Sequence, residues 1–150
     1  MTDDFSGSVE IATSPEATWP VIQDPAALGR ALPDCESIKP DGSGGLNVVV
    51  AVKQMFMTVR IDLHVTYHDL DEPHHLRLDL DGQPRGIGGA LHLSVPIEMT
   101  ATPGGARVDY RGSLVLEGML TSFRKQVLEG LRTQVDHLVR NIEREAAAQR

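Results

Sequence analysis

Cysteine, aromatic side chains and excess positive charge are all scarce in this chain of 150 residues. Cys35 is the single cysteine, so the chain can form neither an internal disulfide nor a cysteine-based metal cluster, as is usual in a reducing compartment. The formal net charge is −7, and no run of Lys or Arg stands apart from acidic neighbours. We therefore expect no nucleic acid partner. Aromatic residues contribute only 4%, which leaves few large rings to fill a wide interior.

Long hydrophobic runs are missing as well. The longest apolar run, residues 46–52 interrupted by Asn47, is far shorter than the roughly 20 residues of a membrane helix. The first residues, Met-Thr-Asp-Asp, lack the basic and apolar regions of a signal peptide. We expect a cytoplasmic protein with no integral membrane segment. With a hydrophobic content of 41%, the length fits a single domain over residues 1–150.

The last stretch, residues 119–149, has the pattern of a long amphipathic helix. Its apolar side chains recur at helical spacing, and charged residues take the opposite face. The apolar stripe comprises Leu120, Phe123, Val127, Leu131, Val135, Leu138 and Ile142. A helix of this length needs a long partner, which the preceding strands can supply.

Two short helices are expected after a first strand at residues 5–11. Ser14-Pro15 and Asp24-Pro25 each combine an N-cap residue with proline at the first helical position, where the missing N–H is not needed. Pro20 falls inside the first helix and predicts a kink or an early end near Trp19. Pro33 should end the second helix at residue 31 or 32.

Six further strands follow, each with alternating apolar and polar residues. Turns rich in Gly and Pro separate them at hairpin distances, which indicates antiparallel pairing. The strands are expected at residues 37–40, 46–53, 55–69, 76–81, 91–99 and 108–116. The pattern predicts an α+β protein in which a curved antiparallel sheet of about seven strands wraps the C-terminal helix.

This order of elements is that of the helix-grip fold of START domains, polyketide cyclases and the major birch-pollen allergen. Residues 5–11 (Phe-Ser-Gly-Ser-Val-Glu-Ile), 14–19 (Ser-Pro-Glu-Ala-Thr-Trp) and 24–38, with Asp-Pro-Ala-Ala-Leu and Pro-Asp-Cys-Glu, resemble the opening of the carbon monoxide dehydrogenase G-subunit family. Asp34 stands where that family usually has glycine. The resemblance implies a non-catalytic accessory protein of a molybdenum hydroxylase.

The interior faces of the predicted sheet and helix are apolar, which predicts a site for a hydrophobic small molecule. Tyr67 and Tyr110 are their only polar residues, and the strands supply no inward His, Asp, Glu or Lys for acid–base chemistry. We therefore predict no catalytic residues. Gly112 shares this face, where a larger side chain is expected to fill the site. The predicted ligand-binding residues are Met55, Met57, Ile61, Leu63, Val65, Tyr67, Leu78, Leu93, Met99, Tyr110, Leu120, Phe123, Val127 and Leu131.

Metal and phosphate sites are not expected. The six histidines fall on outward strand positions, in a bend or alone on the last helix, and no spacing gathers three or four ligands. The glycine-rich residues 82–89 lead into a strand, whereas a phosphate-binding loop leads into a helix. We expect them to form a hairpin at the rim of the interior. Cys35 lies between two acidic residues, which disfavour a reactive thiolate.

The sequence thus predicts a cofactor-free accessory protein that binds a quinone- or lipid-like molecule. Two alternatives remain: a polyketide cyclase-like enzyme of the same superfamily, and a ligand-free interaction module for dehydrogenase maturation. An ordered polar pair inside the pocket would favour the enzyme. A filled core with an exposed apolar patch would favour the module.

Overall fold

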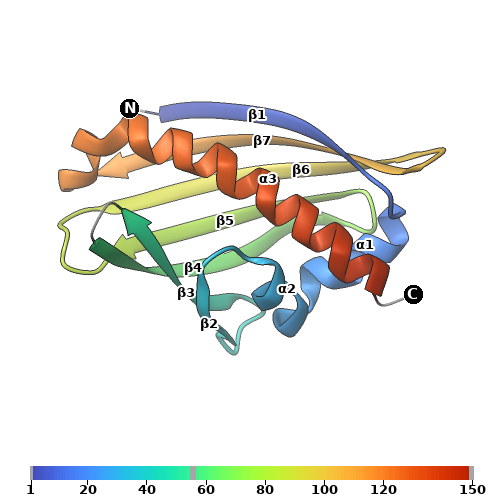
Figure 1. The fold of residues 1–150 in the computed structure, drawn as a ribbon, viewed down its shortest axis with the longest axis horizontal. Coiled ribbons are helices and arrows are strands. Elements are labelled where there is room, and N and C mark those ends of the chain that lie inside the picture. The colour runs from blue at the N-terminus through green and yellow to red at the C-terminus, as the bar shows by residue number, and fades with distance from the viewer. Residues whose placement is uncertain (1, 55–56, 149–150) are drawn as a thin grey trace.

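The computed structural model describes the backbone of residues 2–54 and 57–148 (Figure 1). A first strand is followed by two helices, six further strands and a long helix that begins with a 3₁₀ turn. The elements are β1 (Thr2–Ile11), α1 (Pro15–Gln23), α2 (Pro25–Ala31), β2 (Cys35–Pro40), β3 (Leu46–Gln54), β4 (Met57–Asp71), β5 (His75–Pro84), β6 (Ala90–Thr102), β7 (Gly105–Glu117), η1 (Gly118–Phe123) and α3 (Arg124–Ala148).

The strands form one antiparallel sheet of seven strands in the order β1-β7-β6-β5-β4-β3-β2. The sheet curves, α3 crosses its concave face, and α1 and α2 lie near the C-terminal end of α3 (Figure 1). This is the helix-grip arrangement predicted from the sequence, and the α+β class is confirmed.

Both predicted N-caps form, but the early end of the first helix predicted near Trp19 is wrong. Ser14 Oγ accepts a hydrogen bond from the amide of Ala17 at 3.2 Å, and Asp24 Oδ1 accepts one from Ala26 at 3.1 Å. Helix α1 continues through Pro20 to Gln23. Pro20 and Glu16 are both exposed, so water can solvate the Glu16 carbonyl that the proline leaves without an amide partner.

The long helix also begins later than the sequence predicts. Residues 118–123 form a 3₁₀ turn, and the α-helix starts at Arg124 rather than at residue 119. Gly118 has a φ of 66°, and its Cα lies so close to Gly89 that a β-carbon would come within 2.8 Å of the Gly89 Cα. The chain therefore turns sharply against the β5–β6 loop before α3 can begin.

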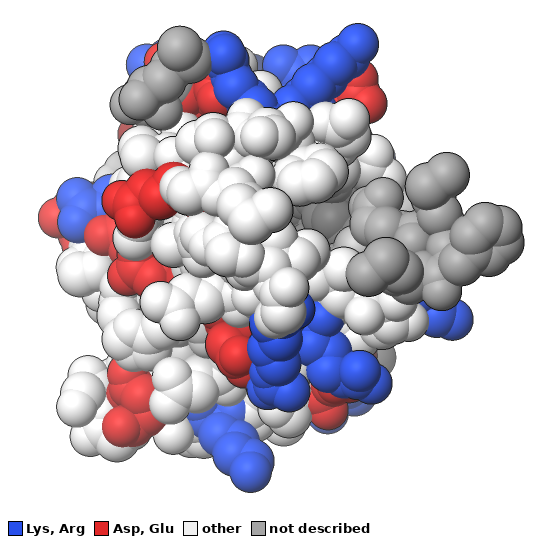
Figure 2. Space-filling view, turned by 90° about the vertical axis from the view of Figure 1, so that its left-hand side faces the viewer, with Lys and Arg blue, Asp and Glu red and all other residues white. Residues whose placement is uncertain are grey.

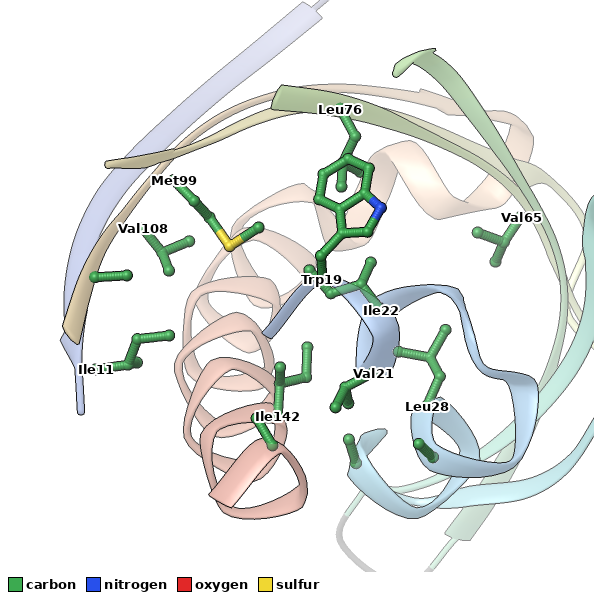
Figure 3. Packing of buried hydrophobic residues seen from close by; sticks show 14 of the residues in the cluster. Ile11, Trp19, Val21, Ile22, Leu28, Val65, Leu76, Met99, Val108 and Ile142 are labelled. Carbon is green, nitrogen blue, oxygen red and sulfur yellow. The ribbon is translucent and has the colours of Figure 1, made fainter. Parts of the chain in front are cut away.

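The buried core divides into two clusters. One lies where α1 and α2 meet the C-terminal half of α3 and includes Trp19, Val21 and Leu76 (Figure 3). The other lies under β1, β6 and β7 and joins Phe5 and Leu114 to apolar residues of α3. The space between helix and sheet is therefore most completely filled near these two clusters.

A candidate apolar ligand cavity

The long helix stands off the centre of the sheet. Helix α3 packs against α1, α2 and β1 rather than directly against β4 and β5. Inner-face residues of the central strands remain only partly buried although a helix covers them. They include Ile61, Leu63, Leu78, Leu80, Leu91 and Ile97. Side chains that face a helix but stay partly accessible indicate a space that protein atoms do not fill.

That space is a cavity of about 260 Å³ with an almost wholly apolar wall. Its volume lies just below the usual range for small-molecule sites, which begins near 300 Å³. The wall is contributed by the sheet, by α1, α2 and the loop after α2, and by α3 from residue 131 to residue 142.

Most of the predicted ligand-binding residues that the structure describes meet at this cavity. Those that line it are Ile61, Leu63, Tyr67, Leu78, Leu93, Met99, Tyr110 and Leu131. The structure places Val65, Leu120, Phe123 and Val127 outside the lining. Met55 and the side chain of Met57 lie outside the described part of the chain. Whether these residues bind a ligand stays a prediction.

The cavity lies farther along α3 than the sequence interpretation placed it. Val127 packs in the cluster with Phe5 and Leu114, and Phe123 is 46% exposed. Apart from the predicted Leu131, the helical wall is formed by residues that the site prediction omitted. These are Gln134, Val135, Leu138, Val139 and Ile142. Val135, Leu138 and Ile142 belong to the predicted apolar stripe, so the pattern indicated the face of the helix but not the position along it.

The short helices and further strand residues complete the wall. Ile22, Leu28 and Leu32 close the end beneath α1 and α2. Further strand residues of the wall lie at the same alternate, inward-facing positions as the predicted strand residues, so the sequence pattern could have identified them. They are Leu80, Leu91, Val95 and Ile97. The short helices carried no comparable signal, because a sequence pattern does not show which side of a short helix faces a distant sheet.

Two polar groups in the wall are bonded within the protein. The Tyr67 hydroxyl donates to the carbonyl of Ile22 at 2.8 Å, and burial raises the pKa of Tyr67 to about 12. The Thr18 hydroxyl donates to the carbonyl of Ser14 at 2.8 Å and lies 2.9 Å from the Thr13 hydroxyl. These groups hold α1 in place and are not free to act on a ligand.

Tyr110 separates the cavity from a polar surface cleft between β1 and α3. It lines both spaces, and Arg132 and Asp136 line the cleft. Burial raises the pKa of Tyr110, and the negative charge of Asp136 raises it further. Across the strand pair Tyr110 faces Gly7, where a β-carbon would collide with the tyrosine hydroxyl. Tyr110 thus forms a wall between an apolar and a charged environment.

Charged side chains are almost absent from the cavity wall. Among the described lining residues, Asp34 is the one carboxylate, and no Lys, Arg or His contributes. Asp34 is exposed and has a φ of 60°, a conformation that glycine adopts most readily. This backbone conformation gives a structural reason for the glycine that usually occupies the position in the family the sequence resembles.

One end of the molecule is largely uncharged. The β5–β6 loop packs there against the start of η1, since a β-carbon on Gly88 would lie 3.6 Å from the sulfur of Met119. Figure 2 shows this end as a mostly uncharged surface with a hollow, and with charged side chains mainly toward its margin. Met119 is 63% exposed. The glycine-rich loop therefore lies at an apolar end of the fold.

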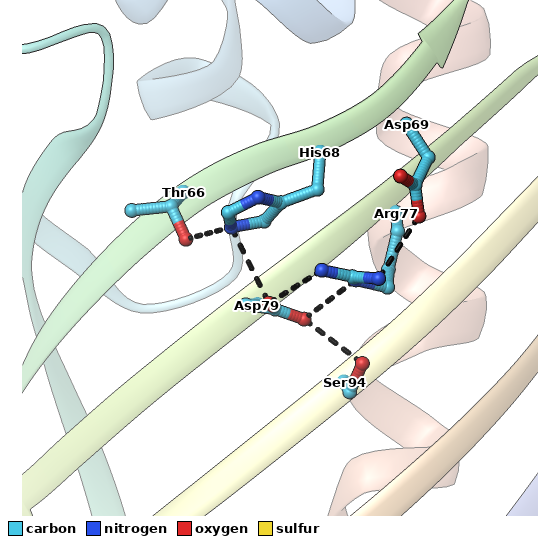
Figure 4. A network of polar contacts seen from close by, with 6 residues as sticks. All are labelled: Thr66, His68, Asp69, Arg77, Asp79 and Ser94. Carbon is cyan, nitrogen blue, oxygen red and sulfur yellow. Dashed lines mark hydrogen bonds and ion pairs between the residues drawn. The ribbon is translucent and has the colours of Figure 1, made fainter.

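The histidines of the convex face lie against carboxylates rather than against one another. His64 Nε2 is 2.7 Å from Asp41, and His92 Nδ1 is 2.6 Å from Asp81. His68 Nε2 lies 3.3 Å from Asp79, which also binds Arg77 and Ser94 (Figure 4). In the part of the chain that the structure describes, no three His, Cys, Asp or Glu side chains are grouped to hold a metal ion.

Cys35 is partly buried, and burial raises the pKa of its thiol.

Comparison with known proteins identifies the family. Residues 7–147 match the carbon monoxide dehydrogenase G-subunit family, CoxG. The chain belongs to the CoxG family. The resemblance stated from the sequence is thereby confirmed. No curated protein matches this CoxG family member, and none of the described helices is both long and apolar enough to cross a membrane.

Solved structures of similar fold support the helix-grip assignment. A conserved protein from Geobacillus kaustophilus has 20% identity and a TM-score of 0.86 and aligns over 97% of this chain and 96% of its own. Ara h 8.0201 has 12% identity and a TM-score of 0.72 over 99% of both chains. The di-domain ARO/CYC StfQ of the steffimycin biosynthetic pathway has 9% identity and a TM-score of 0.69, over 99% of this chain and 51% of its own.

Proposed function

We propose that this CoxG family protein is a non-catalytic carrier of a hydrophobic, quinone- or lipid-like molecule that serves a molybdenum hydroxylase. The observation that carries the proposal is the apolar cavity of about 260 Å³ between α3 and the sheet. An unfilled apolar space weakens packing unless a ligand gains from it. Membership of the family supports the dehydrogenase as partner.

The size of the cavity suits the ring system of such a ligand. An engineered cavity of about 150 Å³ is large enough to bind benzene, and the present cavity of about 260 Å³ is larger. A two-ring quinone head therefore fits better than a long lipid chain held entirely inside.

The wall chemistry favours a carrier over a cyclase-like enzyme. General acid–base catalysis needs a group whose proton is available at the substrate. The Tyr67 hydroxyl is bonded to Ile22, its pKa is raised to about 12, and the Asp34 carboxylate is exposed. The open cavity also argues against a ligand-free module, for which we expect a filled core.

Binding of menadione, a methylated naphthoquinone, tests the proposal. Saturating ligand should raise the melting temperature of the protein, because a ligand bound only to the folded state stabilises it in proportion to RT ln(1 + [L]/Kd). Solvent extraction of natively purified protein, followed by mass spectrometry, should release an apolar molecule.

A plugged variant distinguishes the cavity from surface adsorption. Leu80 lines the cavity on β5, so Leu80→Trp should fill it and weaken menadione binding at least tenfold. Thr100→Trp adds the same ring at an exposed position of β6 and should bind like the wild type. If a folded Leu80→Trp or Leu80→Phe protein binds with unchanged affinity, the carrier function is overturned.

A further inference from the structure

Strand β1 forms one edge of the sheet, and hydrogen bonds join it to α3 near both of its ends. Arg124 donates to the carboxylate of Asp3 at one end, and Arg140 donates to the carbonyl of Glu10 at the other. These two contacts are seven residues apart on the strand, about 23 Å, and sixteen residues apart on the helix, about 24 Å. Helix and strand therefore run side by side between the contacts and in the same direction (Figure 1).

The middle of β1 has unpaired backbone groups along its outer edge, the edge that is not paired with β7. In a strand, the backbone N–H and C=O groups of alternate residues point to the same edge. The carbonyl of Glu10 points outward to α3, so the backbone groups of Ser6 and Ser8 lie on the outer edge as well. Among the described residues, neither serine has a backbone hydrogen bond beyond the sheet. Such an edge is a template for a further strand.

This outer edge borders the polar cleft between β1 and α3. The cleft has a volume of about 670 Å³, and its wall is more polar than apolar. It is lined by residues 4–8 of β1, by Tyr110 and Arg111 of β7, and by Arg132 and Asp136 of α3. Residues 4–8 span about 13 Å in an extended strand, so the cleft has the length of a five-residue extended segment.

The two arginines of the cleft lack carboxylate partners. Within the described part of the chain, neither Arg111 nor Arg132 forms an ion pair, whereas seven other arginines do. This is unexpected in a chain with a net charge of −7. The two carboxylates of the cleft, in contrast, have hydroxyl partners, because Asp4 accepts a hydrogen bond from a serine of β7 at 3.1 Å and Asp136 interacts with Tyr110. The cleft is therefore complementary to an acidic occupant.

We propose that this cleft binds an acidic segment of a partner protein, which adds to β1 as an extended strand. The backbone of the segment pairs with the outer edge of β1, and its Asp or Glu side chains pair with Arg111 and Arg132. A small carboxylic acid would pair with the arginines but would leave the strand edge unbonded. The site is separate from the apolar cavity and does not depend on the carrier function.

Three synthetic peptides test the charge and the strand pairing separately. The first is acetyl-Thr-Glu-Val-Glu-Thr-amide, the second has Lys in place of Glu, and the third is the acidic peptide N-methylated at Val and the following Glu. Calorimetry is carried out at low ionic strength, because salt screens exposed charges. The acidic peptide should bind at least about fivefold more tightly than the Lys peptide. N-methylation should weaken its binding about 2- to 12-fold, the value of one backbone hydrogen bond.

Each peptide can overturn the proposal. No binding of the acidic peptide overturns it outright, and equal binding of the Lys peptide overturns the acidic occupant. Equal binding of the N-methylated peptide overturns the added strand. Glutarate, a small dicarboxylate, should bind more weakly than the acidic peptide, and equal affinity would assign the cleft to small acids instead.

Protein variants place the peptide in the cleft. Arg111→Gln and Arg132→Gln should each weaken binding of the acidic peptide about 2- to 5-fold, as expected for exposed ion pairs. Arg144→Gln removes an exposed arginine of the same helix outside the cleft and should bind like the wild type. Ser6→Pro removes an edge N–H, which an edge strand tolerates, and should weaken binding of the peptide. If Ser6→Pro does not fold, the arginine variants decide, and wild-type affinity in the double variant of Arg111 and Arg132 overturns the site.

Discussion

Phe5 and Tyr110 lie on neighbouring strands with ring centroids 6.2 Å apart, and each ring covers a glycine on the other residue's strand. Phe5 is paired with Gly112, and Tyr110 is paired with Gly7. A β-carbon on either glycine would collide with the ring opposite. The expectation that Gly112 offers space for a larger side chain is therefore wrong, because the ring of Phe5 already occupies that space.

The first prediction follows from this packing. Gly112→Ala should lower the free energy of unfolding by about 1–3 kcal/mol, since the added methyl group displaces the Phe5 ring. Urea denaturation measures the change. In the Phe5→Leu background the same substitution should be less harmful, because the obstructing ring is gone. Equal losses in both backgrounds would contradict the assigned contact.

Tyr67→Phe should destabilise the protein by about 1 kcal/mol at neutral pH, because the bond to the Ile22 carbonyl is lost. The pKa of Tyr67 is raised to about 12 in the folded protein, against about 10 in an unfolded chain. Its contribution is therefore complete below pH 10 and declines between pH 10 and 12, by about 1.4 kcal/mol per pH unit. The stability difference between wild type and Tyr67→Phe, measured by urea denaturation across this range, should shrink as the pH rises and change sign before pH 12, because the total loss of about 2.7 kcal/mol exceeds the contribution of about 1 kcal/mol from the hydrogen bond. A constant difference would contradict the raised pKa.

Leu131→Glu should destabilise the fold by about 3 kcal/mol, because it places an unpaired charge between helix and sheet. Leu131 lines the cavity and packs on the cluster of Phe5 and Leu114. Gln126→Glu, at an exposed position of the same helix, should change stability by less than about 0.5 kcal/mol. Thermal unfolding of the two variants provides the comparison, and similar melting temperatures would mean that the inward face of α3 is misassigned.

Asp34 adopts a left-handed backbone conformation with a φ of 60°. Asp34→Val should lower stability by about 1–2 kcal/mol, because a β-branched side chain is strained in this region. Asp34→Gly should be tolerated, with a change below about 1 kcal/mol, since glycine relieves strain but loses more entropy on folding. Chemical denaturation of both variants tests the difference. A more stable valine variant would contradict the assigned backbone conformation.

The sequence predicted the fold because each element carries its own periodic signal. Alternation in β4 and β5, the Ser14 and Asp24 caps and the apolar stripe of α3 all agree with the observed arrangement. The early helix end predicted at Pro20 is wrong because the effect of a proline depends on whether water can reach the carbonyl it leaves free. That exposure is a property of the folded molecule.

The site was predicted only in part, for a related reason. Strand parity identifies residues such as Leu63 and Leu78 as inward, and the structure places them in the cavity wall. It does not reveal where helix and sheet separate. That position depends on the packing of α1, α2 and β1 against α3, which moves the cavity from Phe123 and Val127 to Gln134 and Leu138.

The pairing of β1 with β7 has a consequence for how the chain folds. Thr2 lies opposite Val115, and Ile11 lies opposite Ala106, so β1 cannot pair until β7, the last of the seven strands, has been made. Helix α3 then ties the outer edge of β1, through Arg124 with Asp3 and through Arg140 with the carbonyl of Glu10. Closing such distant pairs is slow. A nascent chain therefore carries β1 unpaired until β7 has been made, and the sheet should form late and cooperatively.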